Sequence, residues 1–187
     1  MLVQDVEQLC FSFFPHRKLV VQRSAGQISS DAGLLAVREL DEQLGYTRRL
    51  AACLTDPRRN PQQGLLLMLR QRVYGMLADY EDCNDHDDLR NDPIFKLIAD
   101  RLPEGWPLAS QPTLSRFENG VTIKALYNTM DFLVDTGIER LRQKHGGRLP
   151  ACLTLDIDAT DDPTHGEQQL TFFHRSEEHT SELQSRT

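Results

Sequence analysis

The chain has 187 residues, of which 26% are charged, and its formal net charge at pH 7 is -7. This composition is typical of a soluble globular protein and leaves room for one domain, or for a small domain with part of another. The acidic balance argues against a domain that coats nucleic acid, which would be basic, but not against a nuclease, because a nuclease concentrates carboxylates to hold metal ions.

Helical patterns dominate the first 145 residues, after a short strand expected at 19–21. A helix is predicted over 31–44, because capping residues at Ser29–Asp31 precede an apolar periodicity that Gly45 ends. Its apolar face is formed by Leu34, Leu35, Val37, Leu40 and Leu44. Further helices are predicted by the same criteria at 47–54, 61–79, 85–91, 93–100, 111–119 and 122–145.

Two of these helices have distinctive faces. In the helix predicted at 61–79, Arg70 and Arg72 lie off the apolar stripe. The helix predicted at 122–145 is the longest. Its apolar face is formed by Leu126, Met130, Leu133, Val134, Ile138 and Leu141.

The pattern changes at Gly146–Gly147, which we interpret as a hinge. Strands are predicted at 151–157 and 168–173. The sequence therefore predicts a mainly α N-terminal region over 1–147, followed over 148–174 by the first β-hairpin of an α/β core.

The first of these strands carries candidate metal ligands. Alternate side chains of a strand share a face, so Asp156 and Asp158 point one way while Leu155 and Ile157 point the other. Hard cations such as Mg²⁺ take carboxylate oxygens, and a pair of metal ions can activate a nucleophile in phosphodiester chemistry. The alternative is an acidic strand end that runs into a solvated turn, and one strand cannot complete such a metal site by itself.

A second acidic cluster covers 80–88 and contains the adjacent pair His86–Asp87. This pair is typical of helical metal-dependent phosphohydrolases, but the remaining histidines of the chain stand in no partner motif. A capping and hydrogen-bonding network at a helix junction is the favoured interpretation.

The helix predicted at 111–119 is a candidate DNA contact, with Thr113, Ser115 and Arg116 as residues that could reach phosphates or bases. The alternative is a short packing helix that uses Leu114 and Phe117.

Cysteine usage and hydropathy indicate the compartment. The four cysteines form no CxxC pair, so neither a zinc site nor a disulfide framework is expected. No signal-peptide pattern and no run long enough to cross a bilayer is present, and we expect a cytoplasmic protein without membrane contact.

The last residues, 175–187, are polar and have no apolar stripe. They match one reading frame of a common sequencing-library adapter, and we interpret them as an artefact tail. The alternative is an ordinary disordered tail.

Four motifs in register resemble one family. They are the segments 27–35, 80–87, 110–119 and 155–166, within a match from about Phe13 to His174. Together they resemble the bacterial insertion-sequence transposases of the DDE superfamily, in particular the IS thirteen-eighty group.

The resemblance implies an RNase H-like catalytic domain with a DDE triad and Mg²⁺. It implies hydrolysis at the ends of an insertion sequence and attack of the freed 3′-hydroxyl on target DNA, so that the partners are DNA and a possible second copy in a homodimer. The family's first Asp, in an Asp-x-Thr context, maps to Asp158, with Asp156 as the fallback.

The sequence departs from the family pattern after His174. The second Asp and the Glu are expected downstream, so we expect a truncated transposase that is inactive alone. The alternatives are a stand-alone helical module for DNA binding or assembly, and a helical phosphohydrolase that uses His86 and Asp87.

Overall fold

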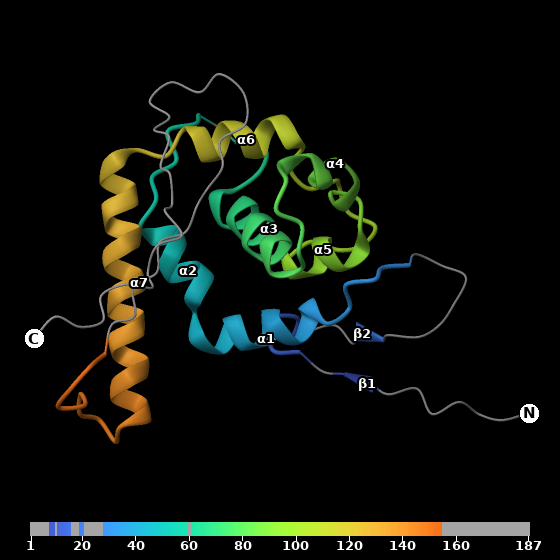
Figure 1. Ribbon diagram of the computed structural model, residues 1–187. Helices are drawn as coiled ribbons and strands as arrows, with labels where there is room; N and C mark the ends of the chain where they lie inside the picture. The colour runs from blue at the N-terminus through green and yellow to red at the C-terminus, as the bar shows by residue number, and fades with distance from the viewer. Residues whose placement is uncertain (1–7, 10, 16–18, 21–27, 60, 155–187) are drawn as a thin grey trace, which may run out of the picture.

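The computed structural model describes residues 8–9, 11–15, 19–20, 28–59 and 61–154 (Figure 1). Two short strands, β1 (Gln8–Leu9) and β2 (Leu19–Val20), pair in antiparallel fashion. The helices are α1 (Leu34–Leu44), α2 (Tyr46–Ala52), α3 (Leu65–Leu77), the 3₁₀ turn η1 (Cys83–Asp85), α4 (His86–Leu89), α5 (Pro93–Ile98), α6 (Gln111–Asn119) and α7 (Ile123–Lys144). The predicted mainly α architecture of the N-terminal region is therefore confirmed for the described residues.

Short-range chemistry sets the ends of several helices. Asp92 caps α5 by accepting hydrogen bonds from the amides of Ile94 (2.7 Å) and Phe95 (3.0 Å). Thr122 caps α7 in the same way through the amide of Ala125. Gly45 ends α1 at φ 63°, a left-handed conformation that favours glycine, and it directly precedes α2. A single residue therefore makes the corner between α1 and α2.

The main core lies where α1, α3 and α5 meet (Figure 1). Its central side chains are fully buried: Leu35, Tyr74, Phe95, Ile98 and Leu108. A smaller cluster of Met68, Ala109 and Leu114 packs α6 against α3. Burial of these apolar side chains provides the main driving force for this packing.

An ionic network with two buried arginines joins α1 and α3 to Asp100, just beyond the end of α5. Arg38 contacts Asp100 (2.9 Å) and Glu42 (2.8 Å), and Arg70 also pairs with Asp100. Arg38 and Arg70 are fully buried, so burial opposes their charge, yet the carboxylates of Asp100 and Glu42 hold the pKa of Arg38 above its ordinary value. The apolar periodicity of the sequence gave no indication that Arg38, Arg70 and Asp100 are paired.

One carboxylate organises the junction of α1 with α2. Asp41 accepts hydrogen bonds from the amide of Thr47 (2.7 Å), from the hydroxyl of Thr47 and from the hydroxyl of Tyr74 (2.7 Å). Burial alone would raise the pKa of Asp41, but these donors and the charge of Arg70 keep it below its ordinary value. Asp41 is therefore a buried anion with a full set of donors.

α7 is packed differently from the other helices. It stands along α2, which it contacts through Phe132, whose ring lies 5.2 Å from that of Tyr46 (Figure 1). Glu139 adds a double hydrogen bond from Arg49 (3.1 and 3.2 Å). The apolar face predicted from the sequence is the opposite one, and most of it is exposed.

The remaining predictions fall at the C-terminal end. Residues 151–154 form no strand, and 155–187 lie outside the described residues, with the rest of the predicted hairpin and the adapter-like tail. In the part of the chain that is described, no helix is both long and apolar enough to cross a membrane.

Candidate nucleic-acid interface

α6 begins and ends as its sequence predicts. Ser110 precedes it, Pro112 stands in its first turn, and the amide of Gln111 donates to Asp87 (3.1 Å). Leu114 is fully buried on its inner side, where Phe117 also packs. α6 is therefore a packing helix on one side, and its other side is open to solvent.

The three predicted DNA contacts differ in their exposure and in the direction in which they project. Arg116 is exposed, and it has no ion pair within the described residues. Thr113 is half-buried and lies 3.1 Å from the hydroxyl of Ser110, while Ser115 contacts Asn119 (3.3 Å). Because an α-helix turns by about 100° per residue, Thr113 and Ser115 project about 160° apart. Arg116 is the predicted contact that is most available to a phosphate.

Polar contacts with α3 and η1 fix the position of α6. Glu118 pairs with Arg72 and lies 3.3 Å from the thiol of Cys83. Before the helix begins, the side-chain amide of Gln71 makes two hydrogen bonds with the backbone of Ala109, at 2.9 and 3.1 Å. These contacts join two of the sequence motifs, 80–87 and 110–119, into one structural unit.

His86 lies at the centre of this unit and is fully buried. Its Nε2 atom lies 3.1 Å from Nη1 of Arg72, and because a guanidinium always donates, this nitrogen is the acceptor. Burial, with the charge of Arg72, lowers the pKa of His86 to about 4. The neighbouring cation favours a hydrogen-bonding role over a metal site, as expected from the sequence.

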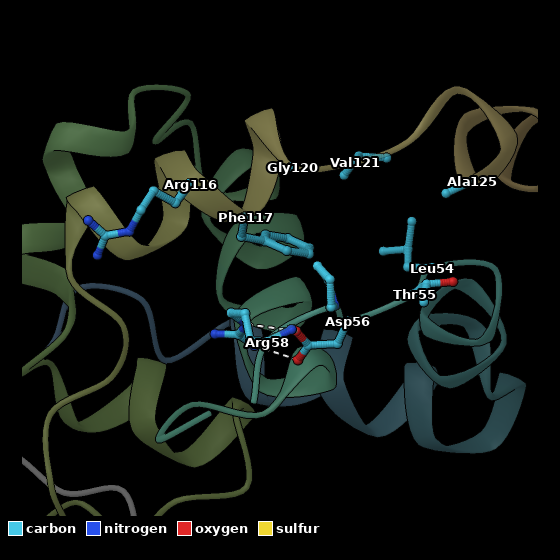
Figure 2. A pocket seen from close by; sticks show the side chains of 10 residues that line it. Leu54, Thr55, Asp56, Arg58, Arg116, Phe117, Gly120, Val121 and Ala125 are labelled. Atoms are coloured by element: carbon cyan, nitrogen blue, oxygen red, sulfur yellow. Dashed lines mark hydrogen bonds and ion pairs between the residues drawn. The ribbon is translucent and has the colours of Figure 1, made fainter. Parts of the chain in front are cut away.

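A small pocket lies behind α6, between it, the start of α7 and the segment 54–58 (Figure 2). It encloses about 50 Å³, which is room for a few water molecules but not for a nucleotide. Arg58 pairs with Asp56 at its rim (2.7 Å), and this hydrogen bond keeps the pKa of Asp56 below its ordinary value. Figure 2 shows Phe117 beside this pair and the Arg116 guanidinium pointing away from it.

A family model described as Transposase DDE domain group 1 matches residues 11–180. The chain belongs to this family. The match covers nearly the whole sequence, so it includes both the helical unit and the acidic segment that follows it. Comparison with curated proteins and with solved structures gave no match.

Membership in this transposase family implies DNA as a partner and a divalent metal ion as a cofactor. Within the described ranges there is no cluster of three or more His, Cys, Asp or Glu side chains that could hold a metal ion. The predicted metal ligands of this transposase domain, Asp156 and Asp158, lie outside the described residues.

Sequence reasoning missed the residues that hold α6 in place, chiefly Gln71 and Arg72. Their signal is the run Arg70–Arg72, three polar residues in a row inside an otherwise apolar helix. Consecutive residues point in directions about 100° apart, so a run of three covers more than half of the helix circumference and approaches the buried side.

Proposed function

We propose that this chain is the N-terminal part of a DDE transposase of the IS thirteen-eighty group. A helical region over 1–147 would bind DNA and support assembly, and an RNase H-like catalytic domain would begin at 148. The family match over 11–180 carries this proposal. The mainly helical architecture up to α7 and the alternating residues of 153–158 support the division.

The catalytic metal ions would be held by Asp158, with Asp156 on the same face of its predicted strand. Two carboxylates give the hard oxygen donors that Mg²⁺ prefers, so the donor chemistry fits. When bound, the metal would supply charge stabilisation at the phosphate and an activated nucleophile. The role of the protein residues is to hold that metal at the cleavage point.

The DNA contact proposed for the helical region is the exposed side of α6. Its inner side is fixed by Leu114 and by the Glu118–Arg72 pair, so the helix presents Arg116 on a rigid base. A guanidinium on a fixed helix is suited to a phosphate, and phosphate contacts position a protein on DNA.

DNA binding can be tested by fluorescence anisotropy with duplexes that carry the ends of the element. We expect Arg116→Gln to weaken binding and to lower the salt dependence by about one phosphate contact. Arg140→Gln, an exposed arginine of α7, is the matched control and should bind like the parent chain. Equal binding by both variants would exclude α6 as the contact.

Catalysis needs a separate test. The resemblance puts the other two acidic members of the triad beyond His174, so we propose that this chain does not cleave DNA alone. A cleavage assay with Mg²⁺ on the same duplexes should give no product. If the chain cleaves DNA and Asp158→Ala abolishes this cleavage, the proposed inactivity is wrong. The assignment of Asp158 as a metal ligand would then be supported.

The alternative function is a helical module that binds DNA or mediates assembly as a homodimer, without catalysis. One observation favours this alternative: the described helices form their own core around Phe95 and Leu35. Such a module would bind the duplexes equally well after Asp158→Ala.

A further inference from the structure

α7 has two faces with opposite environments. Ala125 and Phe132 are buried on the side toward α2. The other side is apolar yet exposed, and we call it the outer face of α7. It consists of Ile123, Leu126, Tyr127, Met130, Leu133 and Val134, with exposed fractions from 46% to 73%.

The outer face is a continuous stripe. At about 100° per residue, its six side chains fall within a sector of about 120°, centred opposite Phe132. A soluble helix normally turns such a stripe toward a core, and large exposed apolar patches mark contact surfaces. The outer face therefore fits a packing partner.

The chain reverses direction as soon as α7 ends. Gly146 and Gly147 have positive φ values of 66° and 88°, and the amide of Gly147 donates to the carbonyl of Arg142 (2.7 Å). This arrangement is a Schellman motif, which closes the helix. Figure 1 shows the orange segment turning back from the lower end of α7. The segment that follows is thus directed back toward the helix.

The returning segment carries a matching apolar row. Leu149 and Leu153 are 45% and 54% exposed, and Leu155 and Ile157 continue the alternation that begins at Leu153. Eight extended residues span about 26 Å, while α7 rises about 21 Å from Lys144 back to Met130. Leu155 can therefore reach the level of Met130.

We propose that the outer face of α7 is the packing surface for the strand predicted at 151–157 of the same chain. Leu155 and Ile157 would cover it, and Asp156 and Asp158 would then point away from α7, toward the catalytic cleft. The inference rests on the proposed start of the catalytic domain at residue 148.

A partner in the same chain is favoured over a second copy. The link from Lys144 to Leu153 is short, so it holds the strand near the outer face at a high effective concentration. The helix would in this way fix which side of the strand presents its carboxylates.

Disulfide formation in the full 187-residue chain tests the packing. In a background with Cys10, Cys53, Cys83 and Cys152 replaced by serine, the test pair is Met130→Cys with Leu155→Cys. We expect it to form an intramolecular disulfide on mild oxidation, read on a non-reducing gel and by mass spectrometry.

Two control pairs define the geometry in that same background. Met130→Cys with Asp156→Cys moves the strand thiol to the other face, and Asn128→Cys with Leu155→Cys moves the helix thiol away from the outer face. Both pairs should oxidise at least fivefold more slowly than the test pair. Circular dichroism checks that every variant keeps its helices.

Equal rates for the test and control pairs, or no disulfide in the test pair, would overturn the proposal. A disulfide-linked dimer from Met130→Cys alone would overturn it in favour of a second copy. None of these readouts depends on DNA cleavage or DNA binding, so a failure here is distinct from a failure of the proposed function.

Discussion

Asp100 and Asp79 both adopt left-handed backbone conformations, at φ 60° and 70°, but their side chains differ in ion pairing. Both aspartates are exposed, but Asp100 pairs with the fully buried Arg38 and Arg70, whereas Asp79 has no ion pair within the described residues. Asparagine tolerates the left-handed conformation as well as aspartate does. The two positions therefore allow the charge to be removed without changing the backbone preference.

Asp100→Asn should lower the free energy of unfolding by about 1–2 kcal/mol. Arg38 and Arg70 would lose one carboxylate partner that is partly screened by solvent, while Glu42 and Asp41 stay near them. Asp79→Asn, the matched control, should change it by less than about 0.5 kcal/mol. Urea unfolding of both variants measures the difference. If the two variants are equally stable, the ion pairs of Asp100 do not contribute measurably to the free energy of unfolding.

His86 makes the stability of the protein depend on pH. Its pKa is about 4 in the folded chain and about 6.5 when unfolded, so between these values only the unfolded state takes up the proton. The contribution of neutral His86 is complete above pH 6.5 and is lost as the pH falls to 4. The loss amounts to about 3 kcal/mol over this window.

A pair of glutamine variants isolates this effect. In His86→Gln, the slope of unfolding free energy against pH between 4 and 6.5 should fall by up to one proton. His145→Gln, at an exposed position, should keep the parent slope. Urea titrations at several pH values give the slopes, and an unchanged slope in His86→Gln would place its folded pKa near the ordinary value.

Within helices, two glycines are expected to respond to alanine in opposite directions. A Cβ at Gly75 in α3 would lie 2.7 Å from Cε1 of His86, and because His86 is enclosed it cannot move away. A Cβ at Gly137 in α7 would meet nothing within 4 Å. Close packing therefore governs the first position and helix propensity governs the second.

Gly75→Ala should destabilise the protein by about 1–3 kcal/mol, since overpacking displaces the ring of His86. Gly137→Ala should stabilise α7 by about 0.5–1 kcal/mol. Thermal unfolding followed by circular dichroism compares both with the parent chain. A stabilising Gly75→Ala would show that the space around His86 is larger than the geometry indicates.

The helices were predictable because local signals specify them: caps at Asp92 and Thr122, a left-handed glycine at Gly45, and apolar periodicity in between. The side of each helix that is buried was not predictable, because it depends on residues that are distant in the sequence. In α1, the sequence favoured Leu40 as a core residue, yet Leu40 is exposed while Arg38 is buried. Hydropathy cannot reveal a buried charge whose counterion, Asp100, lies 62 residues away.

The candidate site was predictable in part for the same reason. Arg116 could be proposed as a DNA contact because it belongs to a short amphipathic helix, and it is exposed. Thr113 lies about 60° from Arg116 around the helix, whereas Ser115 lies about 100° from it, so only Thr113 shares its side of α6. The proposed ligands Asp156 and Asp158 rest on strand alternation and family resemblance, and they remain predictions.

Across the whole molecule, α7 is attached differently from the other helices. Its described contacts run through α2, by Phe132 against Tyr46 and by Glu139 with Arg49. The core of α1, α3 and α5 is enclosed around Phe95, which is fully buried. A unit held by few buried side chains opens at lower free energy than the core, so α7 should exchange its amide hydrogens before α3 does.

Phe132→Ala should therefore accelerate amide exchange in α7 while leaving α3 and α5 protected, as read by hydrogen exchange with mass spectrometry. Phe95→Ala is the matched control, and it should lower the free energy of unfolding of the whole molecule by about 3–5 kcal/mol. If Phe132→Ala weakened protection in α3 as much as in α7, the two would form one cooperative unit. Selective loss in α7 would show that the helix next to the proposed catalytic strand can move without unfolding the region that presents Arg116.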